Sequence, residues 1–161
     1  MLNLLRSSLL VLLVTVSGHA HGAQPQTLDA EPVVVQTPRG PAAFMAEIAS
    51  TPAQRAIGLM YRDSLGDDRA MLFDYQTPQP AFMWMKNTLI PLDMLFIADD
   101  GVILHIEVEA QPGDLRPRGT SEPVRGVLEI TAGTADRLGI RPGMMVHHRI
   151  FGNELPPNGG G

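Results

Sequence analysis

The sequence predicts a mainly β protein, a small antiparallel β-sandwich or half-closed barrel with two short helices. Short apolar runs separated by clusters of Gly, Pro, Asn and Asp recur along the chain, and this pattern is typical of short strands joined by turns. The pair Asp100-Gly101 lies between two of these runs, as in a tight hairpin. Signals for the start of a helix occur in two places.

The expected strands follow from the apolar runs taken in order. Residues 33–36 and 43–49 flank a Pro-Arg-Gly-Pro segment and form a hairpin with a long loop. Residues 92–98 and 102–109 form the clearest hairpin. In the second of these two strands, apolar residues at every other position predict one buried and one mostly solvated face. Four further strands are expected at residues 71–75, 82–86, 124–131 and 144–151.

Two short helices are expected between the strands. Thr51 is placed as an N-cap, Pro52 as the first helical residue and Gln54 as the capping-box partner, so a helix begins here and extends to about residue 60. Residues 134–138 form the second helix, because Gly139 is placed to end it in the left-handed region.

The N-terminus has the pattern of an export signal. A short basic segment precedes an apolar run at residues 9–16, and Gly18-His19-Ala20 matches a small-x-small cleavage site. The run is too short to cross a bilayer, which takes on the order of 20 apolar residues. We therefore predict a signal peptide at residues 1–20, with cleavage after residue 23 as the alternative, and a periplasmic or secreted protein that leaves the membrane after cleavage. The remainder divides into a flexible lead-in at residues 21–32, a single β domain at residues 33–151 and a disordered tail at residues 152–161.

Composition excludes several classes of function. The chain has no cysteine, which excludes a thiol nucleophile, a redox pair, disulfides and Cys-based metal sites. Its formal net charge of -5 argues against nucleic acid as a partner, since phosphate binding needs a surplus of Lys and Arg. The nine methionines are interpreted as core-filling residues and not as Cu(I) ligands. No metal ion and no other cofactor is predicted.

Three sequence blocks resemble a known family. They are Arg55-x-x-Gly58-Leu59-Met60-x-Arg62, Trp84-Met85-Lys86-Asn87-Thr88-x-Ile90-Pro91-Leu92-Asp93 and Gly133-Thr134-Ala135-x-Arg137-Leu138-Gly139-Ile140. Through them the chain resembles the domain-of-unknown-function family number 192, an uncharacterised prokaryotic group, over about residues 33–150. The resemblance implies the same small β-sandwich or half-closed barrel and no known activity. Many relatives have cysteines in the loop that corresponds to residues 111–123, so any thiol role in those relatives is absent here.

Trp84 and Lys86, the only tryptophan and the only lysine, are the strongest candidates for a site. In a strand, side chains two residues apart project to the same face. An indole for stacking beside an ammonium, followed by Asn87, favours a small polar or anionic ligand such as a saccharide. Arg62 and Asp93 complete the predicted ligand-binding set of a binding module. The alternative is that Trp84 belongs to the core and Lys86 pairs with Asp93.

Two other classes of function stay open. A hydrolase or lyase would use Lys86 with Asp93 or Glu129, because paired ionisable groups at set separations perform acid–base chemistry. Glu129 stands between two apolar residues. It either pairs with an arginine, Arg125 four residues earlier or Arg137 in the next helix, or is tuned for proton transfer. A structural or assembly part of the cell envelope is the third class, and it predicts an exposed apolar patch. The sequence predicts neither the identity of the ligand nor the oligomeric state.

Overall fold

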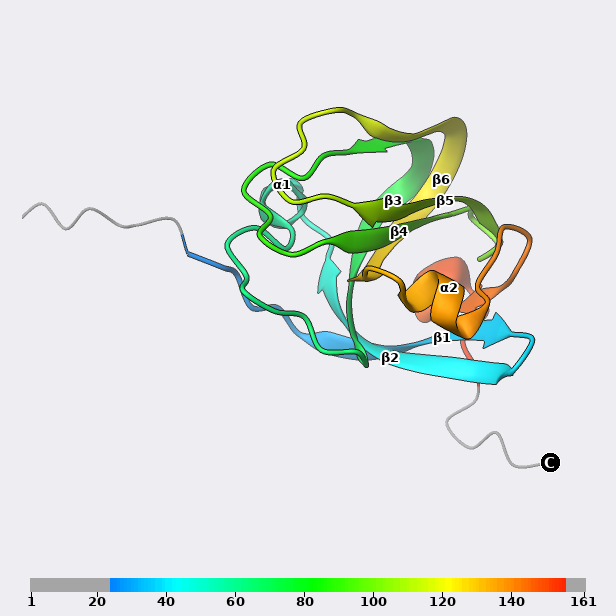
Figure 1. Ribbon diagram of the computed structural model, residues 1–161. Helices are drawn as coiled ribbons and strands as arrows, with labels where there is room; N and C mark the ends of the chain where they lie inside the picture. The colour runs from blue at the N-terminus through cyan, green and yellow to red at the C-terminus, as the bar shows by residue number, and fades with distance from the viewer. Residues whose placement is uncertain (1–23, 156–161) are drawn as a thin grey trace, which may run out of the picture.

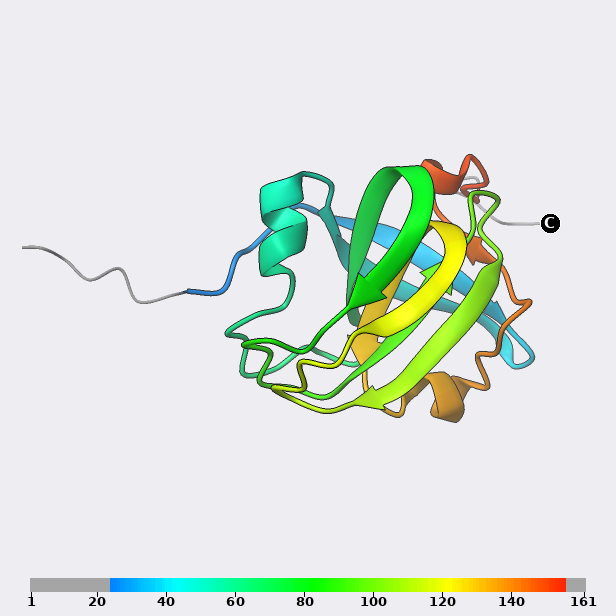
Figure 2. The same ribbon diagram turned by 90° about the horizontal axis from the view of Figure 1, so that it is seen from above.

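The computed structural model describes residues 24–155 (Figure 1). Its elements, in chain order, are β1 (Ala30–Thr37), β2 (Gly40–Ala49), α1 (Pro52–Ile57), β3 (Arg69–Met83), β4 (Leu92–Ile97), β5 (Ile103–Ala110), β6 (Arg118–Thr131), α2 (Thr134–Leu138), β7 (Val146–His147) and the 3-10 helix η1 (Arg149–Phe151). The strands form one sheet in the order β5-β4-β6-β3-β2-β1-β7. The sheet curves strongly, and α1 and α2 lie apart from each other at its periphery (Figures 1 and 2).

The sheet forms a half-barrel, which confirms the predicted fold class, but its strands are not all antiparallel. Strands β2 and β3 run parallel, with Met45 opposite Arg69, while the other neighbouring strands are antiparallel. The expectation of an antiparallel sheet misses this pair. Helix α1 and the loop after it carry the chain from the end of β2 back to the start of β3, which is the crossover that parallel strands need.

Apolar side chains pack on both faces of the sheet. One buried cluster joins one face to Ala135 of α2 and Phe151 of η1. The other cluster joins the opposite face to Leu59, which follows α1, and to Met85. All six residues of β4 are buried, because this strand contributes to both clusters. The second cluster borders the candidate site.

The predicted elements are present with shifted ends. Both hairpins are present, but the long loop expected in the first is wrong, because Thr37 pairs with Gly40 and only Pro38 and Arg39 lie between the strands. Thr51 and Gln54 form the expected capping box. Helix α1 ends at Ile57, earlier than predicted, because Gly58 leaves the helical conformation. The two strands expected at residues 71–75 and 82–86 are one long strand, β3, whose pairing with β6 contains irregularities. The strand expected at residues 144–151 is reduced to β7, followed by η1.

The segment before β1 is bonded to the rest of the fold. Gln26 donates hydrogen bonds from Nε2 to the carbonyl oxygens of Gln54 and Gly58, at 2.8 and 3.0 Å. Strand β1 begins at Ala30, inside the lead-in expected for residues 21–32. Residues 24–32 are therefore tied to α1 and the sheet.

The predicted signal peptide, residues 1–20, and the end of the predicted tail, residues 156–161, lie outside the described residues. Within residues 24–155, none of the helices is long and apolar enough to cross a membrane.

Candidate functional site

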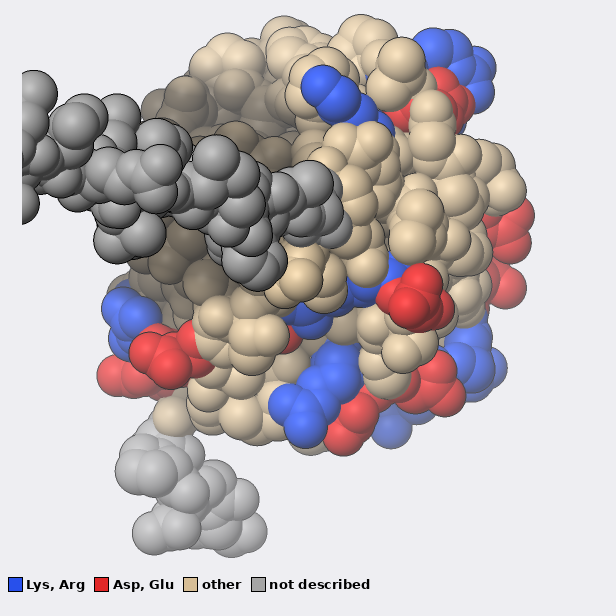
Figure 3. Space-filling model, turned by 90° about the vertical axis from the view of Figure 1, so that its left-hand side faces the viewer, with Lys and Arg blue, Asp and Glu red and all other residues tan. Residues whose placement is uncertain are grey.

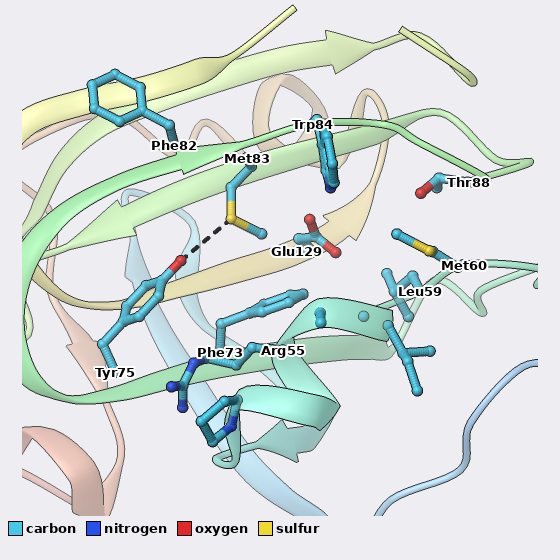
Figure 4. A pocket seen from close by; sticks show the side chains of 14 residues that line it. Arg55, Leu59, Met60, Phe73, Tyr75, Phe82, Met83, Trp84, Thr88 and Glu129 are labelled. Atoms are coloured by element: carbon cyan, nitrogen blue, oxygen red, sulfur yellow. Dashed lines mark hydrogen bonds between the residues drawn. The ribbon is translucent and has the colours of Figure 1, made fainter. Parts of the chain in front are cut away.

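A pocket of about 300 Å³ lies between α1, strands β3 and β6 and the loop that follows β3 (Figure 4). This volume is at the lower end of the range typical of small-molecule sites. Its walls are mainly apolar, and the residues that define its chemistry are Arg55, Phe73, Tyr75, Met83, Trp84 and Glu129. On the side of the molecule that carries α1, most charged groups lie in the lower part of the view, and a few others lie at its upper and right-hand edges (Figure 3).

Helix α1 forms one wall of the pocket, and the residues at its two ends determine where it begins and ends. The capping box starts α1, and Gly58 ends it with a φ of 52°. A Cβ atom at position 58 would lie 3.0 Å from Cζ of Phe73, so glycine lets the end of the helix pack directly on that ring. Leu59 then enters the core. Helix α1 is thus held against Phe73 and forms one side of the pocket.

Glu129 lies at the base of the pocket. It is on β6, opposite Met71 of β3 and Met94 of β4, which are both fully buried. Glu129 is 3% exposed. Among the described residues no donor is hydrogen-bonded to its carboxyl group, and the carboxyl oxygens open to the pocket and are not sealed within the core. Burial raises the pKa of this carboxyl to about 8. The group therefore lacks the partner that buried carboxyls normally have, and it changes charge near neutral pH.

Tyr75 and Arg55 lie beside Glu129. The pKa of the Tyr75 hydroxyl is raised to about 12, first by burial and then by the negative charge of Glu129, against the opposing charge of Arg55. The hydroxyl donates to Sδ of Met83 at 3.4 Å. Arg55 donates from Nη1 to two backbone carbonyl oxygens, at 2.6 and 2.8 Å, and its guanidinium carbon is 5.5 Å from the centre of the Tyr75 ring. Arg55 is therefore bonded to the backbone and not to Glu129.

Trp84 lines the pocket and is 51% exposed, so it is not a core residue. Nζ of Lys86 lies 5.2 Å from the centre of its indole ring, in a cation–π contact. The two side chains are neighbours, as expected, but strand alternation is not the reason. Strand β3 ends at Met83, and the buried Met85 is hydrogen-bonded to a neighbouring loop. A loop anchored by Met85 therefore presents Trp84 and Lys86.

Arg62 and Asn87, which belong to the predicted ligand-binding set, do not line the pocket. Arg62 donates to both carboxylate oxygens of Glu47, at 2.7 Å each, and to the carbonyl oxygen of Gln26 at 2.6 Å. Asn87 donates from Nδ2 to the hydroxyl of Tyr61 at 2.8 Å. These contacts hold the segment before β1 and the loop after β3, so both residues support the structure around the site.

Asp93 is also separate from the pocket. It is fully buried, and its two oxygens accept hydrogen bonds from the backbone N–H groups of Glu109 and Ala135, at 2.9 Å each. The N-cap residue of α2 is Gly133, which has no side chain to cap the helix, and the Asp93 carboxylate supplies that acceptor. The expected pair of Lys86 and Asp93 is wrong, because Asp93 is already bonded to the backbone.

The expected pair of Arg125 and Glu129 is wrong as well. Arg125 is paired with Asp74 of β3. In a regular strand, residues 125 and 129 would share a face. Val124 and Val127 are three residues apart, yet both belong to the apolar cluster that borders the pocket, and the pairing register of β6 with β3 shifts here. This irregularity breaks the alternation on which the predicted pair depended.

A second cavity of about 450 Å³ lies between β5 and α2, with Asp93, His105 and Glu109 in its lining. The catalytic alternative requires Lys86, Asp93 and Glu129 in one cleft. Asp93 borders the second cavity, Glu129 the first, and Lys86 contacts the ring of Trp84. These three groups do not converge. In residues 24–155 there is no group of three or more His, Cys, Asp and Glu side chains that could hold a metal ion.

Sequence reasoning singled out Trp84 and noted Glu129, but it missed Phe73 and Tyr75. These two residues alternate with Asp74 like ordinary strand residues. Their position beside Glu129 follows from the register of β3 and β6, in which Met71 lies opposite Glu129. A single sequence carries no direct signal for that register.

Two crystal structures of other proteins are similar to this chain. One is a protein of unknown function from Novosphingobium aromaticivorans DSM 12444, with 40% identity and a TM-score of 0.74, and the match covers 78% of this chain and 94% of that chain. The other is from Sinorhizobium meliloti 1021, and a role in transcription regulation has been ascribed to it. It has 42% identity and a TM-score of 0.73, and the match covers 80% of this chain and 98% of that chain. No curated protein matches the chain.

The model of the family DUF192, described as "Uncharacterized ACR", matches residues 33–148. This span contains both helices and every residue that lines the Glu129 pocket. It agrees with the resemblance carried by the three sequence blocks. The chain therefore belongs to the DUF192 family of uncharacterised proteins.

Proposed function

We propose that this domain binds a small organic molecule in the pocket around Glu129. The observation that carries the proposal is a buried carboxyl group, without a hydrogen-bond donor among the described residues, at the base of an apolar pocket. Burial of an unpaired polar group costs stability. Ionisable groups with strongly raised pKa values in cavities are candidates for functional sites. A ligand that pairs with Glu129 explains why a carboxyl group is placed between two buried methionines.

The chemistry of the pocket favours a ligand with an apolar body and one hydrogen-bond donor. Aromatic and thioether side chains supply the walls, and Glu129 supplies one polar anchor. A small polar or anionic ligand, such as a saccharide, was expected from stacking on Trp84 and from the charge of Lys86. That residue contacts the ring of Trp84 and is not part of the lining. The proposal therefore keeps a small ligand and changes its expected chemistry.

Exposed apolar side chains border the pocket. Phe82, Trp84 and Leu115 are all more than half exposed, and together they line a shallow hollow next to the pocket. An exposed apolar patch is also what an envelope assembly part would present. Because Phe82 and Trp84 line both the hollow and the pocket, we assign the patch to the mouth of the ligand site.

The cellular location of the protein and its relation to nucleic acid do not depend on the pocket. Export to the periplasm or the medium is a proposal that rests on residues 1–20 alone. The role ascribed to the Sinorhizobium protein is not transferred, because a formal net charge of -5 gives no electrostatic support for binding nucleic acid.

Trp84 provides the test, because it is the only tryptophan and lines the pocket. The probes are choline, 3,3-dimethylbutan-1-ol, 3,3-dimethylbutanoate and glucose. We expect at least one of them to change the Trp84 fluorescence saturably and to raise Tm by several degrees, about the effect of a ligand at 100 times its Kd.

A matched pair of variants on α1 makes this test specific. Ala56→Phe adds a ring at an exposed position that lines the pocket, and Ala53→Phe adds the same ring at an exposed position that does not. Binding should be lost in Ala56→Phe and kept in Ala53→Phe. The proposal is overturned if none of the four probes binds, or if binding is the same in both variants.

A further inference from the structure

We infer that the ligand of this pocket carries a methylated ammonium group, seated between the aromatic rings of Phe73, Tyr75 and Trp84 and against the carboxylate of Glu129. This inference rests on the proposed function and deepens it, because it names the chemical class of the ligand.

The aromatic lining is the first observation. The protein has one tryptophan, two tyrosines and five phenylalanines, and four of these aromatic residues line this pocket. In Figure 4, Trp84 lies on one side of Glu129, Phe73 on the opposite side, and Tyr75 closes a third side. The faces of aromatic rings attract cations, and enclosures of this kind bind quaternary ammonium groups.

The rings already contact cations of the protein itself. Lys86 lies 5.2 Å from the ring centre of Trp84, and Arg55 lies 5.5 Å from that of Tyr75. Both rings therefore already take part in cation–π contacts. Since Arg55 also lines the pocket, its charge opposes that of a cationic ligand, and the attraction for such a ligand comes from Glu129 and from the other rings of the lining.

The charge balance inside the pocket is the second observation. Glu129 has no cationic partner in the described part of the chain, since Arg55 is bonded to backbone carbonyl oxygens. A buried carboxylate is stable only when it is paired. A cationic ligand supplies that partner, a neutral ligand leaves the charge unpaired, and an anionic ligand adds repulsion.

The pocket has few hydrogen-bond acceptors, and for this reason it suits a methylated ammonium group better than a primary one. A primary ammonium brings three N–H donors, and each of them requires an acceptor when it is buried. Apart from Arg55 and Glu129, the side chains of the lining are mostly rings, aliphatic groups and the thioethers of Met60 and Met83. The Thr88 hydroxyl at the wall is also polar, and it donates to the carbonyl oxygen of Lys86. Methyl groups on the nitrogen pack against such walls and need no acceptor.

The ionisation of Glu129 predicts how binding depends on pH. The carboxyl must lose its proton to pair with a cation, and burial raises its pKa to about 8. Two other ionisable groups face it: Tyr75 from β3, with a pKa raised to about 12, and Arg55 from α1. On the neighbouring strand β4, the residue opposite Glu129 is Met94, which does not ionise. Affinity for a permanently charged cation should therefore rise about tenfold from pH 6 to 7 and about tenfold again from pH 7 to 9.

The experiment compares three probes of one shape by calorimetry at pH 9. Choline is a cation, 3,3-dimethylbutan-1-ol is its neutral analogue with carbon in place of nitrogen, and 3,3-dimethylbutanoate is an anion with the same apolar body. We expect choline to bind at least about tenfold more tightly than either of the others. Glu129→Gln should weaken choline binding by a similar factor and change binding of the neutral analogue less than about twofold.

Two kinds of negative result are distinguishable. If the alcohol or the carboxylate binds as tightly as choline, or if choline binding is independent of pH between 6 and 9, the cationic class is overturned and the proposed function remains. If none of these three probes binds, the cationic class is overturned, and if glucose does not bind either, the proposed function is overturned with it. The pH series uses the unaltered protein, so it decides the matter even if Glu129→Gln does not fold.

Discussion

Replacement of Glu129 by leucine is expected to stabilise the protein, and the gain should grow with pH. The carboxyl has an ordinary pKa of 4.5, and burial raises it to about 8 in the folded protein. Below pH 4.5 the group is neutral in both states and carries no ionisation penalty. Between 4.5 and 8 the unfolded state ionises while the folded state keeps the proton, so stability falls by about 1.4 kcal/mol per pH unit. Above pH 8 the loss is constant at roughly 5 kcal/mol.

Urea unfolding at pH 5, 7 and 9 measures this effect. The difference in unfolding free energy between Glu129→Leu and the unaltered protein should increase by several kcal/mol from pH 5 to pH 9. Glu122→Gln is the matched control, because Glu122 is an exposed carboxylate on the same strand, β6. A Glu129→Leu protein whose difference is flat with pH would show that the carboxyl is not desolvated.

Replacement of Asp93 by alanine is expected to have the opposite effect, a loss of about 3 to 5 kcal/mol. The change removes the acceptors of two backbone N–H groups, the buried one of Ala135 and the partly buried one of Glu109. The N–H group of Ala135 would then lie without a partner away from water, the link to Glu109 on β5 would be lost, and α2 would lose its cap. Urea unfolding measures the total loss, and amide hydrogen exchange at Glu109 and Ala135 should accelerate locally.

Asp136→Ala is the control for this prediction. Asp136 is a carboxylate on α2 itself, its side chain is 86% exposed, and its partner Arg141 is also exposed. An exposed ion pair contributes about 0 to 1 kcal/mol. Equal stabilities of Asp93→Ala and Asp136→Ala would mean that Asp93 does not hold α2 to the sheet. Asp93→Asn keeps one acceptor and should lie between the two alanine variants.

The parts of the fold that depend on neighbouring residues were predictable from the sequence. The Asp100-Gly101 turn and the capping box of Thr51 and Gln54 act over a few residues, and the structure has both. The parallel pairing of β2 with β3 depends on a crossover through α1. The continuity of β3 depends on its long pairing with β6. Both of these features are tertiary, so turn and cap signals do not reveal them.

The candidate site was predictable only where a residue was chemically unusual in its surroundings. Trp84 is the single tryptophan, and Glu129 interrupts an apolar strand, so both drew attention. Arg62, Asn87 and Asp93 are polar residues in a specific motif, but their hydrogen bonds stabilise loops and a helix end. A sequence gives the residue types and does not give their partners. For that reason it did not separate polar groups that are already bonded from the one that is open to the pocket.

The ionisation of Glu129 in the folded protein tests the central claim, that an unpaired carboxyl lies at the base of an apolar pocket. Carbon-13 NMR of the glutamate side-chain carboxyl groups, followed against pH, measures it directly, and the signal missing in Glu129→Gln assigns the resonance. We expect a midpoint near the value of about 8 to which burial raises this pKa. A midpoint near the ordinary value of 4.5 would mean that water or a donor already satisfies the carboxyl, and it would contradict the proposed site.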